Sequence, residues 1–264
     1  MPASSGLDHI IIGVADLEAS AALWRRLGFT VTPRGRHIGW GTANYCVMFP
    51  DDYVELLGIL DPEQYVYGLD RFLEDKGEGL LGLALATQEP EAVYRALEGI
   101  GEAGDPPKDL ARLLELPEGT VTPRFHLVYP RDPDAFGFST FFCKHLTPDL
   151  VRRADWLTHP NGATGLHEIA LRVPDPGRLA SSYEAVFGPG TVAEVDAGIR
   201  VSAGSTVLRF AAGTPAVEHL TIAVGDLSAM AGWLNRVGLG AVSEDNATRS
   251  DQPISGIDIR FVAA

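Results

Sequence analysis

One short sequence motif occurs four times in this chain and constrains its fold more than any other feature. The motif is an apolar strand that ends in an acidic residue, followed by an amphipathic helix and a glycine. The first copy begins at Leu7, has Asp16 at the position of a helix N-cap and ends its helix before Gly28. The other copies begin near residues 80, 166 and 217. Repetition at this scale predicts a fold assembled from copies of one supersecondary unit.

The helix of each copy is indicated by apolar residues three or four positions apart, which share one helix face. In the first copy these residues are Leu17, Ala21, Trp24 and Leu27. An acidic N-cap and a glycine after the last turn are typical helix boundaries. Strands are then expected over residues 29–34, 42–49 and 53–59, with a turn over 35–41 and a short connecting helix within 61–78. The unit is therefore a βαβββ module.

A single βαβββ module cannot bury both faces of its sheet, because its helix covers only one of them. We therefore predict an α+β fold in which four modules pair into two cupped mixed sheets with helices on the outer face. The expected division is a first domain over 1–147 with modules 7–60 and 80–145, a linker over 148–163, and a second domain over 164–264 with modules 164–213 and 216–264.

The charge balance excludes some classes of partner. The formal net charge is −14, which argues against nucleic acid and anionic membrane surfaces, since both require clustered Lys and Arg. No apolar run reaches the roughly 18 residues of a membrane-spanning helix, and the N-terminus does not read as a signal peptide. The two cysteines, Cys46 and Cys143, form no Cys-x-x-Cys motif. We therefore expect a cytoplasmic protein without a disulfide framework.

Three segments carry a resemblance to a known family: LDHIIIGVADL from Leu7, GRHIGWGTAN from Gly35 and YVELLGI from Tyr53. With the repeat, they resemble the vicinal oxygen chelate superfamily of glyoxalase I, extradiol dioxygenases and bleomycin-resistance proteins, and more narrowly its glyoxalase-like family. The resemblance implies paired modules and a site on the concave face of the cup. It fixes no reaction, because this fold hosts isomerases, dioxygenases, lyases, epimerases and non-enzymatic binding proteins.

The resemblance also implies metal ligands. Metal-using members hold a divalent ion with a His on the first strand and a Glu on the last strand of a module, and His9 and Glu55 take these positions here. The second module departs from the pattern, with Gly82 at the His position and Phe141 or Phe142 at the Glu position. A third ligand could come from His37, His126 or His145, which sequence alone does not place. The expected ion is Zn, Ni, Mn or Fe.

The second domain offers a weaker ligand set, Glu168 and His219. Its closing strands supply Leu208 or Arg209 and Ile259 or Arg260 instead of a carboxylate, and an arginine there would suit an anion. Each candidate also has a structural interpretation: His9 as a hydrogen-bonded strand residue, Glu55 as one half of a salt bridge, and the phenylalanines as core. In the first domain we expect Glu55 and His37 to be catalytic, and the substrate to contact Arg36, Trp40, Asn44, Tyr45 and Phe141.

Two functions from different classes remain open. The first is a metal-dependent lyase or isomerase acting on a small oxygen-rich substrate in the first cup, with Glu55 or a nearby His moving a proton. Dioxygenase chemistry is less favoured, because the resemblance places its iron in the second domain, where the carboxylate is missing. The alternative is a metal-free small-molecule binding or sequestration protein of the bleomycin-resistance type. A third possibility makes the second domain a scaffold or a homodimer interface.

Overall fold

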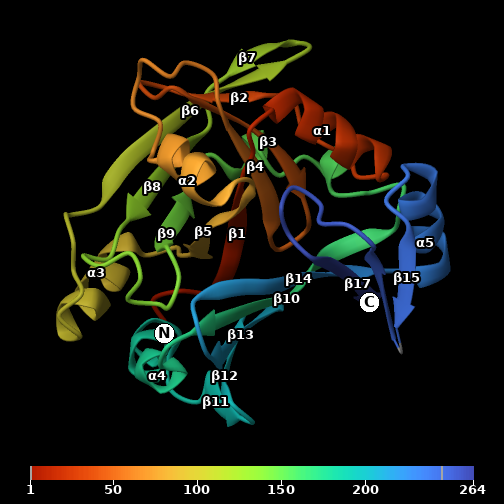
Figure 1. The fold of residues 1–264 in the computed structure, drawn as a ribbon. Helices are drawn as coiled ribbons and strands as arrows, with labels where there is room; N and C mark the ends of the chain where they lie inside the picture. The colour runs from red at the N-terminus through yellow and green to blue at the C-terminus, as the bar shows by residue number, and fades with distance from the viewer. Residues whose placement is uncertain (1, 245) are drawn as a thin grey trace.

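The computed structural model describes residues 2–244 and 246–264, which form two mixed β-sheets with helices packed against them (Figure 1). The first sheet has nine strands in the order β2-β3-β4-β1-β5-β9-β8-β6-β7, and the second has eight in the order β11-β12-β13-β10-β14-β17-β16-β15. The fold is α+β, as predicted. Among the described residues, no helix has the length and apolar character needed to cross a membrane.

Each of the four modules is a strand, a helix and three further strands, with β7 as an addition in the second. The first sheet is made of β1 (Gly6–Gly13), β2 (Gly35–His37), β3 (Thr42–Met48), β4 (Tyr53–Ile59), β5 (Gly79–Ala86), β6 (Lys108–Leu116), β7 (Gly119–Val121), β8 (Arg124–Val128) and β9 (Thr140–His145). The second is made of β10 (Ala163–Val173), β11 (Val192–Val195), β12 (Gly198–Ala203), β13 (Thr206–Ala212), β14 (Ala216–Val224), β15 (Ala241–Glu244), β16 (Ala247–Ser250) and β17 (Ile259–Ala263).

The module helices are α1 (Leu17–Arg26), α3 (Pro90–Gly99), α4 (Ala180–Phe187) and α5 (Leu227–Arg236), and α2 (Leu69–Lys76) is the predicted connecting helix. Asp16 and Asp226 are N-caps as expected, because their carboxylates accept hydrogen bonds from the backbone N–H groups of Ala19 and Ala229. Glu89 makes no such bond, and helix α3 starts instead with Pro90 in its first turn. A 3₁₀ turn, η3 (Pro176–Leu179), precedes α4.

The first sheet closes into a ring, because the short strand β2 pairs with β3 on one side and with β6 on the other. In Figure 1 the strands of this sheet curl around, and helix α2 lies at one end of the ring. The second sheet has no pairing between its edge strands β11 and β15 in the described part of the chain, so it stays open. The same module therefore builds a closed cup once and an open sheet once.

The helix-covered faces of both sheets share one apolar core. It includes Ile10 and Ile12 of β1, Trp24 of α1 and Ile169 of β10. The opposite face of β1 contributes Ile11 to a second apolar cluster inside the ring, where Leu69 of α2 also packs. Strand β1 is thus buried on both faces, which its nearly continuous apolar sequence permits.

One sequence-based boundary was wrong. No strand forms over residues 29–34, where Thr30 instead bonds to Thr158 and His159. The second strand, β2, lies within the stretch expected to be a turn. The segment predicted as a linker packs on the first module. It contains the 3₁₀ turns η1 (Pro148–Leu150) and η2 (Ala154–Trp156), and the buried residues His159 and Asn161 bond to the backbone of the first module at Met48 and Leu27.

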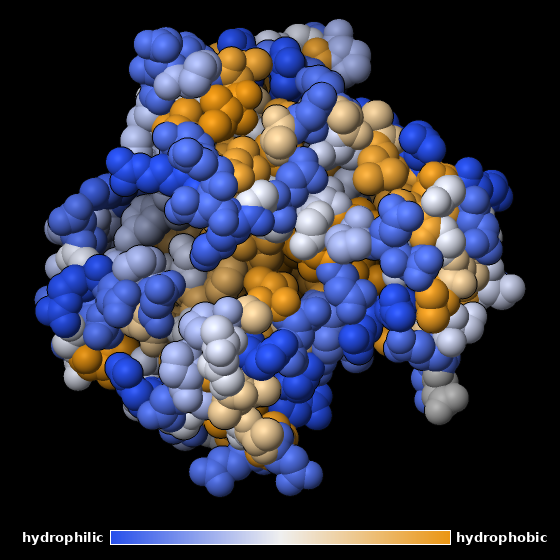
Figure 2. All heavy atoms as spheres, viewed as in Figure 1, coloured by the Kyte–Doolittle hydropathy of each residue, from blue (hydrophilic) through white to orange (hydrophobic). Residues whose placement is uncertain are grey.

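A cleft lies between the two sheets beside α2. Its walls include Phe72 and Lys76 of α2, Leu81 of β5 and Val217 of β14. Figure 2 shows it as a hollow at the centre of this face, with apolar side chains at its floor and polar ones around it.

Asp52, in the turn before β4, joins the first sheet to the second. Its buried carboxyl accepts a hydrogen bond from the Leu166 N–H at 3.1 Å and lies 3.2 Å from the Thr206 hydroxyl, which is 3.1 Å from the Leu166 carbonyl. The single Thr206 proton can serve only one of these two acceptors. If Asp52 is protonated, it donates to Thr206, which then donates to Leu166. Burial raises the pKa of Asp52 to about 7, which agrees with this arrangement.

The fold therefore predicts a pH-dependent tie between the sheets. An unfolded Asp ionises near pH 3.8, whereas folded Asp52 keeps its proton to about pH 7. The folded chain binds the extra proton in this window, so the contribution of Asp52 to stability falls as pH rises through it. Asp52→Asn keeps a hydrogen-bond donor at this position but cannot ionise. Wild type should therefore lose stability relative to this variant as pH rises through the window. The difference in unfolding free energy should change by on the order of 1 to 4 kcal/mol in favour of the variant.

Denaturant unfolding at the two ends of that pH window measures this effect. Asp51→Asn is the matched control, because Asp51 is exposed in the same turn. A difference between Asp52→Asn and wild type that does not change with pH would contradict a protonated Asp52.

Candidate functional site

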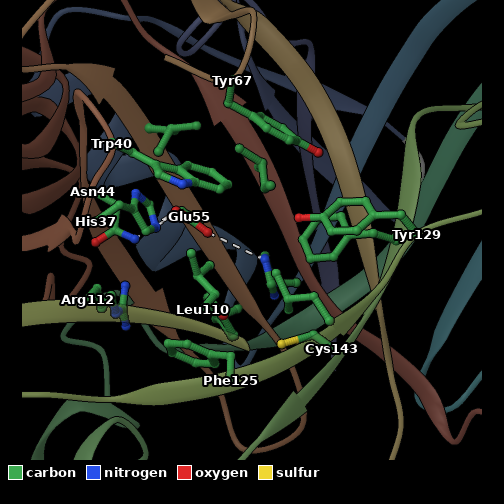
Figure 3. A pocket seen from close by; sticks show the side chains of 16 residues that line it. His37, Trp40, Asn44, Glu55, Tyr67, Leu110, Arg112, Phe125, Tyr129 and Cys143 are labelled. Carbon is green, nitrogen blue, oxygen red and sulfur yellow. Dashed lines mark hydrogen bonds and ion pairs between the residues drawn. The ribbon is translucent and has the colours of Figure 1, made fainter. Parts of the chain in front are cut away.

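A cavity inside the ring holds the buried polar residues of the first sheet. His9 of β1, His37 of β2, Asn44 of β3, Glu55 of β4 and Arg112 of β6 all line it. Figure 3 shows His37, Asn44 and Arg112 on one side of the cavity and Tyr129 across from them. The two modules of the first sheet thus contribute to one site.

A β-bulge in β1 orients His9. In the pairing with β5, Leu7 lies opposite Leu85 and His9 opposite Ala84, so Asp8 is the extra residue. Bulges re-aim side chains, and here Asp8 is buried beside His9, with its carboxylate 2.7 Å from His9 Nδ1. Leu7 consequently packs in the outer core with Ile10, whereas strict alternation along the strand would have placed Leu7 on the same face as His9.

The Glu55 carboxylate lies where two imidazoles converge. His9 Nε2 is 3.4 Å from Oε2, and His37 Nε2 is 4.0 Å from Oε1. The Nδ1 atoms of the two rings contact other groups: Asp8 for His9, and the Thr42 hydroxyl at 2.8 Å for His37. Asn44 Nδ2 donates to Glu55 Oε1 at 2.7 Å. Each imidazole therefore directs Nε2 toward the same carboxylate.

Burial and charge set the protonation of this group. Burial lowers the pKa of His37 to about 4, so this imidazole is neutral at pH 7. Burial alone would raise the pKa of Glu55, but the neighbouring His9, His37 and Arg112 and the Asn44 hydrogen bond outweigh it, and the pKa is lowered. A carboxylate beside a neutral imidazole is the protonation state that metal ligation requires.

A chain of contacts continues from His9 to the end of the ring. Asp8 Oδ2 also lies 3.0 Å from His145 Nε2, and Arg152 from the segment after β9 reaches Asp8 Oδ1 at 3.4 Å. Burial would raise the pKa of Asp8, yet His145 and His9 together bring it far below its ordinary value. Asp8, Cys143 and His145 also form a compact group of potential metal ligands, but Asp8 is already held by two imidazoles and a guanidinium.

Arg112 is a buried cation without a carboxylate partner among the described residues. Its side chain lies opposite His37 in the β2–β6 register and is 5% exposed. Nη1 donates to the Cys46 sulfur at 3.4 Å, and the Phe125 ring lies 5.6 Å away. Nε is buried and has no hydrogen-bond partner among the residues that the structure describes. Gly35 makes room for it, because a Cβ there would meet Arg112 Cδ at 3.1 Å.

Aromatic rings form much of the remaining wall. Trp40 stacks on Tyr67 with ring centroids 5.7 Å apart, and Tyr129 stacks on Phe141 at 5.4 Å. Phe141 meets the His9 ring edge-on at 5.7 Å, and Tyr53 stacks on the other side at 4.4 Å. The cavity therefore combines a polar group with flat apolar walls.

The structure brings most of the sequence-predicted residues into this cavity. His9, His37, Glu55, Trp40, Asn44 and Phe141 all line it, and their functional roles stay predictions. Arg36 and Tyr45 are not among the residues that line it, so this cavity gives no support to their predicted role in substrate binding. Arg36 pairs with Glu115 at 2.6 Å, and the Tyr45 hydroxyl contacts Glu18 at 2.8 Å. Each is adjacent in its strand to an inward residue, His37 or Asn44, and strand side chains alternate in direction.

The weaker ligand pair lies in the second sheet, where Glu168 Oε1 is 3.2 Å from His219 Nε2. The same oxygen is 3.4 Å from Arg209 Nε, and Arg209 also pairs with Glu218 at 2.9 Å. A fixed guanidinium occupies the position where a cation would have to bind. This pair is therefore a poor metal site and belongs to an ion-pair network.

Sequence reasoning missed Asp8, Tyr53, Arg112 and Tyr129. Arg112 carried a partial signal, since it shares one face of strand β6 with the apolar residues Leu110 and Leu114, but nothing in the sequence showed which face the cavity would take. Of the three candidates for a third ligand, only His37 lies beside Glu55. His126 pairs with Asp109 at 2.7 Å, and His145 lies beyond Asp8.

The donor set fits a divalent metal. Two imidazole Nε2 atoms and a carboxylate converge, and each imidazole is held from behind by an oxygen of Asp8 or Thr42. Such second contacts orient ligating histidines in metalloproteins. Two histidines and one carboxylate with open positions are a set that first-row transition metals accept.

Several solved structures share the fold. A crystal structure of a hypothetical protein from Staphylococcus aureus matches with a TM-score of 0.71 and 16% identity, over 98% of this chain and 99% of that one. A mutant 4-hydroxymandelate synthase from Streptomyces coelicolor matches at 0.60 and 16%, over 100% and 93%. A xylose isomerase-like TIM barrel/4-hydroxyphenylpyruvate dioxygenase fusion protein matches at 0.59 and 14%, over 99% of this chain and 49% of the fusion.

Comparison with curated protein sequences gives no match. The family comparison is decisive instead, because the model of the glyoxalase-like domain matches residues 7–187, from the start of β1 to the end of α4. This match and the paired βαβββ modules agree with the resemblance seen in the sequence. The chain belongs to the glyoxalase-like domain family of the vicinal oxygen chelate superfamily.

Proposed function

We propose that this protein is a metal-dependent lyase or isomerase that acts on a small oxygen-rich substrate inside the ring. One observation carries the proposal: His9 and His37 direct Nε2 toward the buried Glu55 carboxylate from two different strands. His9, Glu55 and His37 would hold the ion. When bound, a divalent ion would supply a Lewis acid that polarises substrate oxygens.

The residues around the ligands prepare the site for proton transfer. Glu55 is ionised at neutral pH, since its pKa lies below the ordinary value, and can accept a proton from the substrate. Asn44 fixes the orientation of this carboxylate. Burial raises the pKa of Tyr67 to about 12, so its phenol stays protonated and can donate a hydrogen bond. The closed ring and α2 limit the access of water, which strengthens each of these interactions.

The proposal predicts that metal content depends on His9. Wild-type protein purified without chelator should contain close to one divalent ion per chain by elemental analysis, and His9→Ala, His37→Ala and Glu55→Gln should each contain far less. His126→Ala is the matched control, because His126 is paired with a carboxylate outside the cavity. Metal-free wild type that fails to bind Zn, Ni, Mn or Fe would refute the assignment.

The carboxylate behind His9 should tune metal affinity. Asp8→Asn keeps an oxygen near His9 Nδ1 but removes the charge that polarises the ring. We expect metal affinity to fall by about 10- to 100-fold, the usual effect of losing such a partner. Competition with a chelator measures the change, and Asp109→Asn, which alters the equivalent pair at His126, is the control. Equal affinity in Asp8→Asn and wild type would contradict this role.

A metal-free binding protein is the second candidate, and the second module favours it. In the first module Glu55 pairs with Ile11 of β1, and at the equivalent position of the second module Phe141 pairs with Ala84 of β5. An aromatic ring therefore stands where a second carboxylate ligand would be expected. Ligand-induced thermal shifts that are unchanged by EDTA would favour this candidate over the enzyme.

A further inference from the structure

We infer that Arg112 binds the anionic group of the ligand, and that this ligand is a small carboxylate with a flat apolar body. The inference deepens the proposed function and rests on it for the identity of the ligand as substrate. The evidence for it comes from the surroundings of Arg112, a residue that is not one of the proposed metal ligands His9, His37 and Glu55.

The first argument is the missing counter-charge. An arginine side chain stays protonated in a protein, and burying it without a partner is costly. Arg112 is nevertheless buried against the Cys46 sulfur and the face of the Phe125 ring, and its Nε has no hydrogen-bond partner within residues 2–244 and 246–264. The nearest acidic group in the cavity, Glu55, forms no ion pair with it within the described residues and is instead flanked by His9 and His37.

The second argument is the orientation of the guanidinium. Gly35 of β2 leaves room for the guanidinium, since an added Cβ there would lie 3.3 Å from Nη1, and Nη1 is held by the Cys46 sulfur of β3. Arg112 also lines the cavity on the same wall as His37, because the two residues pair across β2 and β6. A planar fork of donors fixed in this way suits a carboxylate, which it can bind through two parallel hydrogen bonds.

The third argument is the shape of the space in front of Arg112. Phe125, Tyr129, Phe141 and the stacked Trp40 and Tyr67 supply flat walls. A ligand with its carboxylate on Arg112 would therefore place an aromatic or unsaturated body between these rings and reach toward Glu55. Buried stacking contacts of this type favour flat ligands.

Benzoate and phenylacetate, with the neutral benzamide and phenylacetamide as matched probes, test the inference. Binding is measured by calorimetry and by thermal shift, in EDTA and again with added Zn²⁺. Wild type should bind each carboxylate at least about 10-fold more tightly than its amide, since a buried charge-assisted pair contributes this much. Arg112→Met should abolish the preference and keep or raise the apo melting temperature, because it removes an unpaired buried charge.

Arg36→Met is the matched control, because Arg36 is on the adjacent strand but pairs with Glu115 outside the cavity. Should Arg112→Met fail to fold, Arg112→Lys keeps the charge without the fork and should weaken the preference. Equal binding of acid and amide to wild type, binding of neither probe, or a preference that survives in Arg112→Met would overturn the inference. A preference that persists in EDTA and in His9→Ala would uphold the Arg112 site even if the metal proposal fails.

Discussion

The pairing of the three-residue strand β2 with both β3 and β6 is the constraint on which the first cup depends. It closes the sheet, and it is the only place where strands of the first and second modules meet away from the β1–β5 contact, within the described residues. The register places His37 directly opposite Arg112. This pairing brings Arg112 of the second module beside His37, and so beside the polar group that the first module supplies.

Closure of the ring also explains how so many ionisable groups are tolerated in one interior. Asp8, Glu55, two histidines and Arg112 lie within it, and their separate costs of burial are large. Asp8 is stabilised by His9, His145 and Arg152, and Glu55 by its imidazoles and Asn44. Arg112 is the member of this set whose charge is not matched by a contact. An interior arranged in this way is typical of a site in which a ligand completes the network.

The second sheet shows what the same module forms when closure is absent. Glu168 and His219 occupy the first-strand positions of the third and fourth modules, which correspond to His9 and Gly82 of the first sheet. Their side chains lie 3.2 Å apart. Arg209 joins them from the closing strand and links them to Glu218, giving a partly exposed ion-pair network. The open sheet instead contributes its helix-covered face to the shared core, to which the linker and Asp52 fasten it. The same module thus forms a closed cup with a buried polar site in the first sheet and an open sheet that packs on the shared core in the second.

Local sequence was sufficient to predict the modules, since hydrophobic periodicity, acidic N-caps and terminal glycines are properties of neighbouring residues. The resemblance to the glyoxalase-like family, and not periodicity, paired His9 with Glu55, which lie 3.4 Å apart. Strand alternation is broken at Leu7 by the bulge at Asp8, and it directs Arg36 and Tyr45 away from the cavity because their neighbours His37 and Asn44 face inward. The ring closure, the choice of His37 over His126 and His145, and the exposure of Arg112 to the cavity were decided by tertiary structure alone. They depend on which strands pair across more than 70 residues of chain, and no local pattern encodes that register.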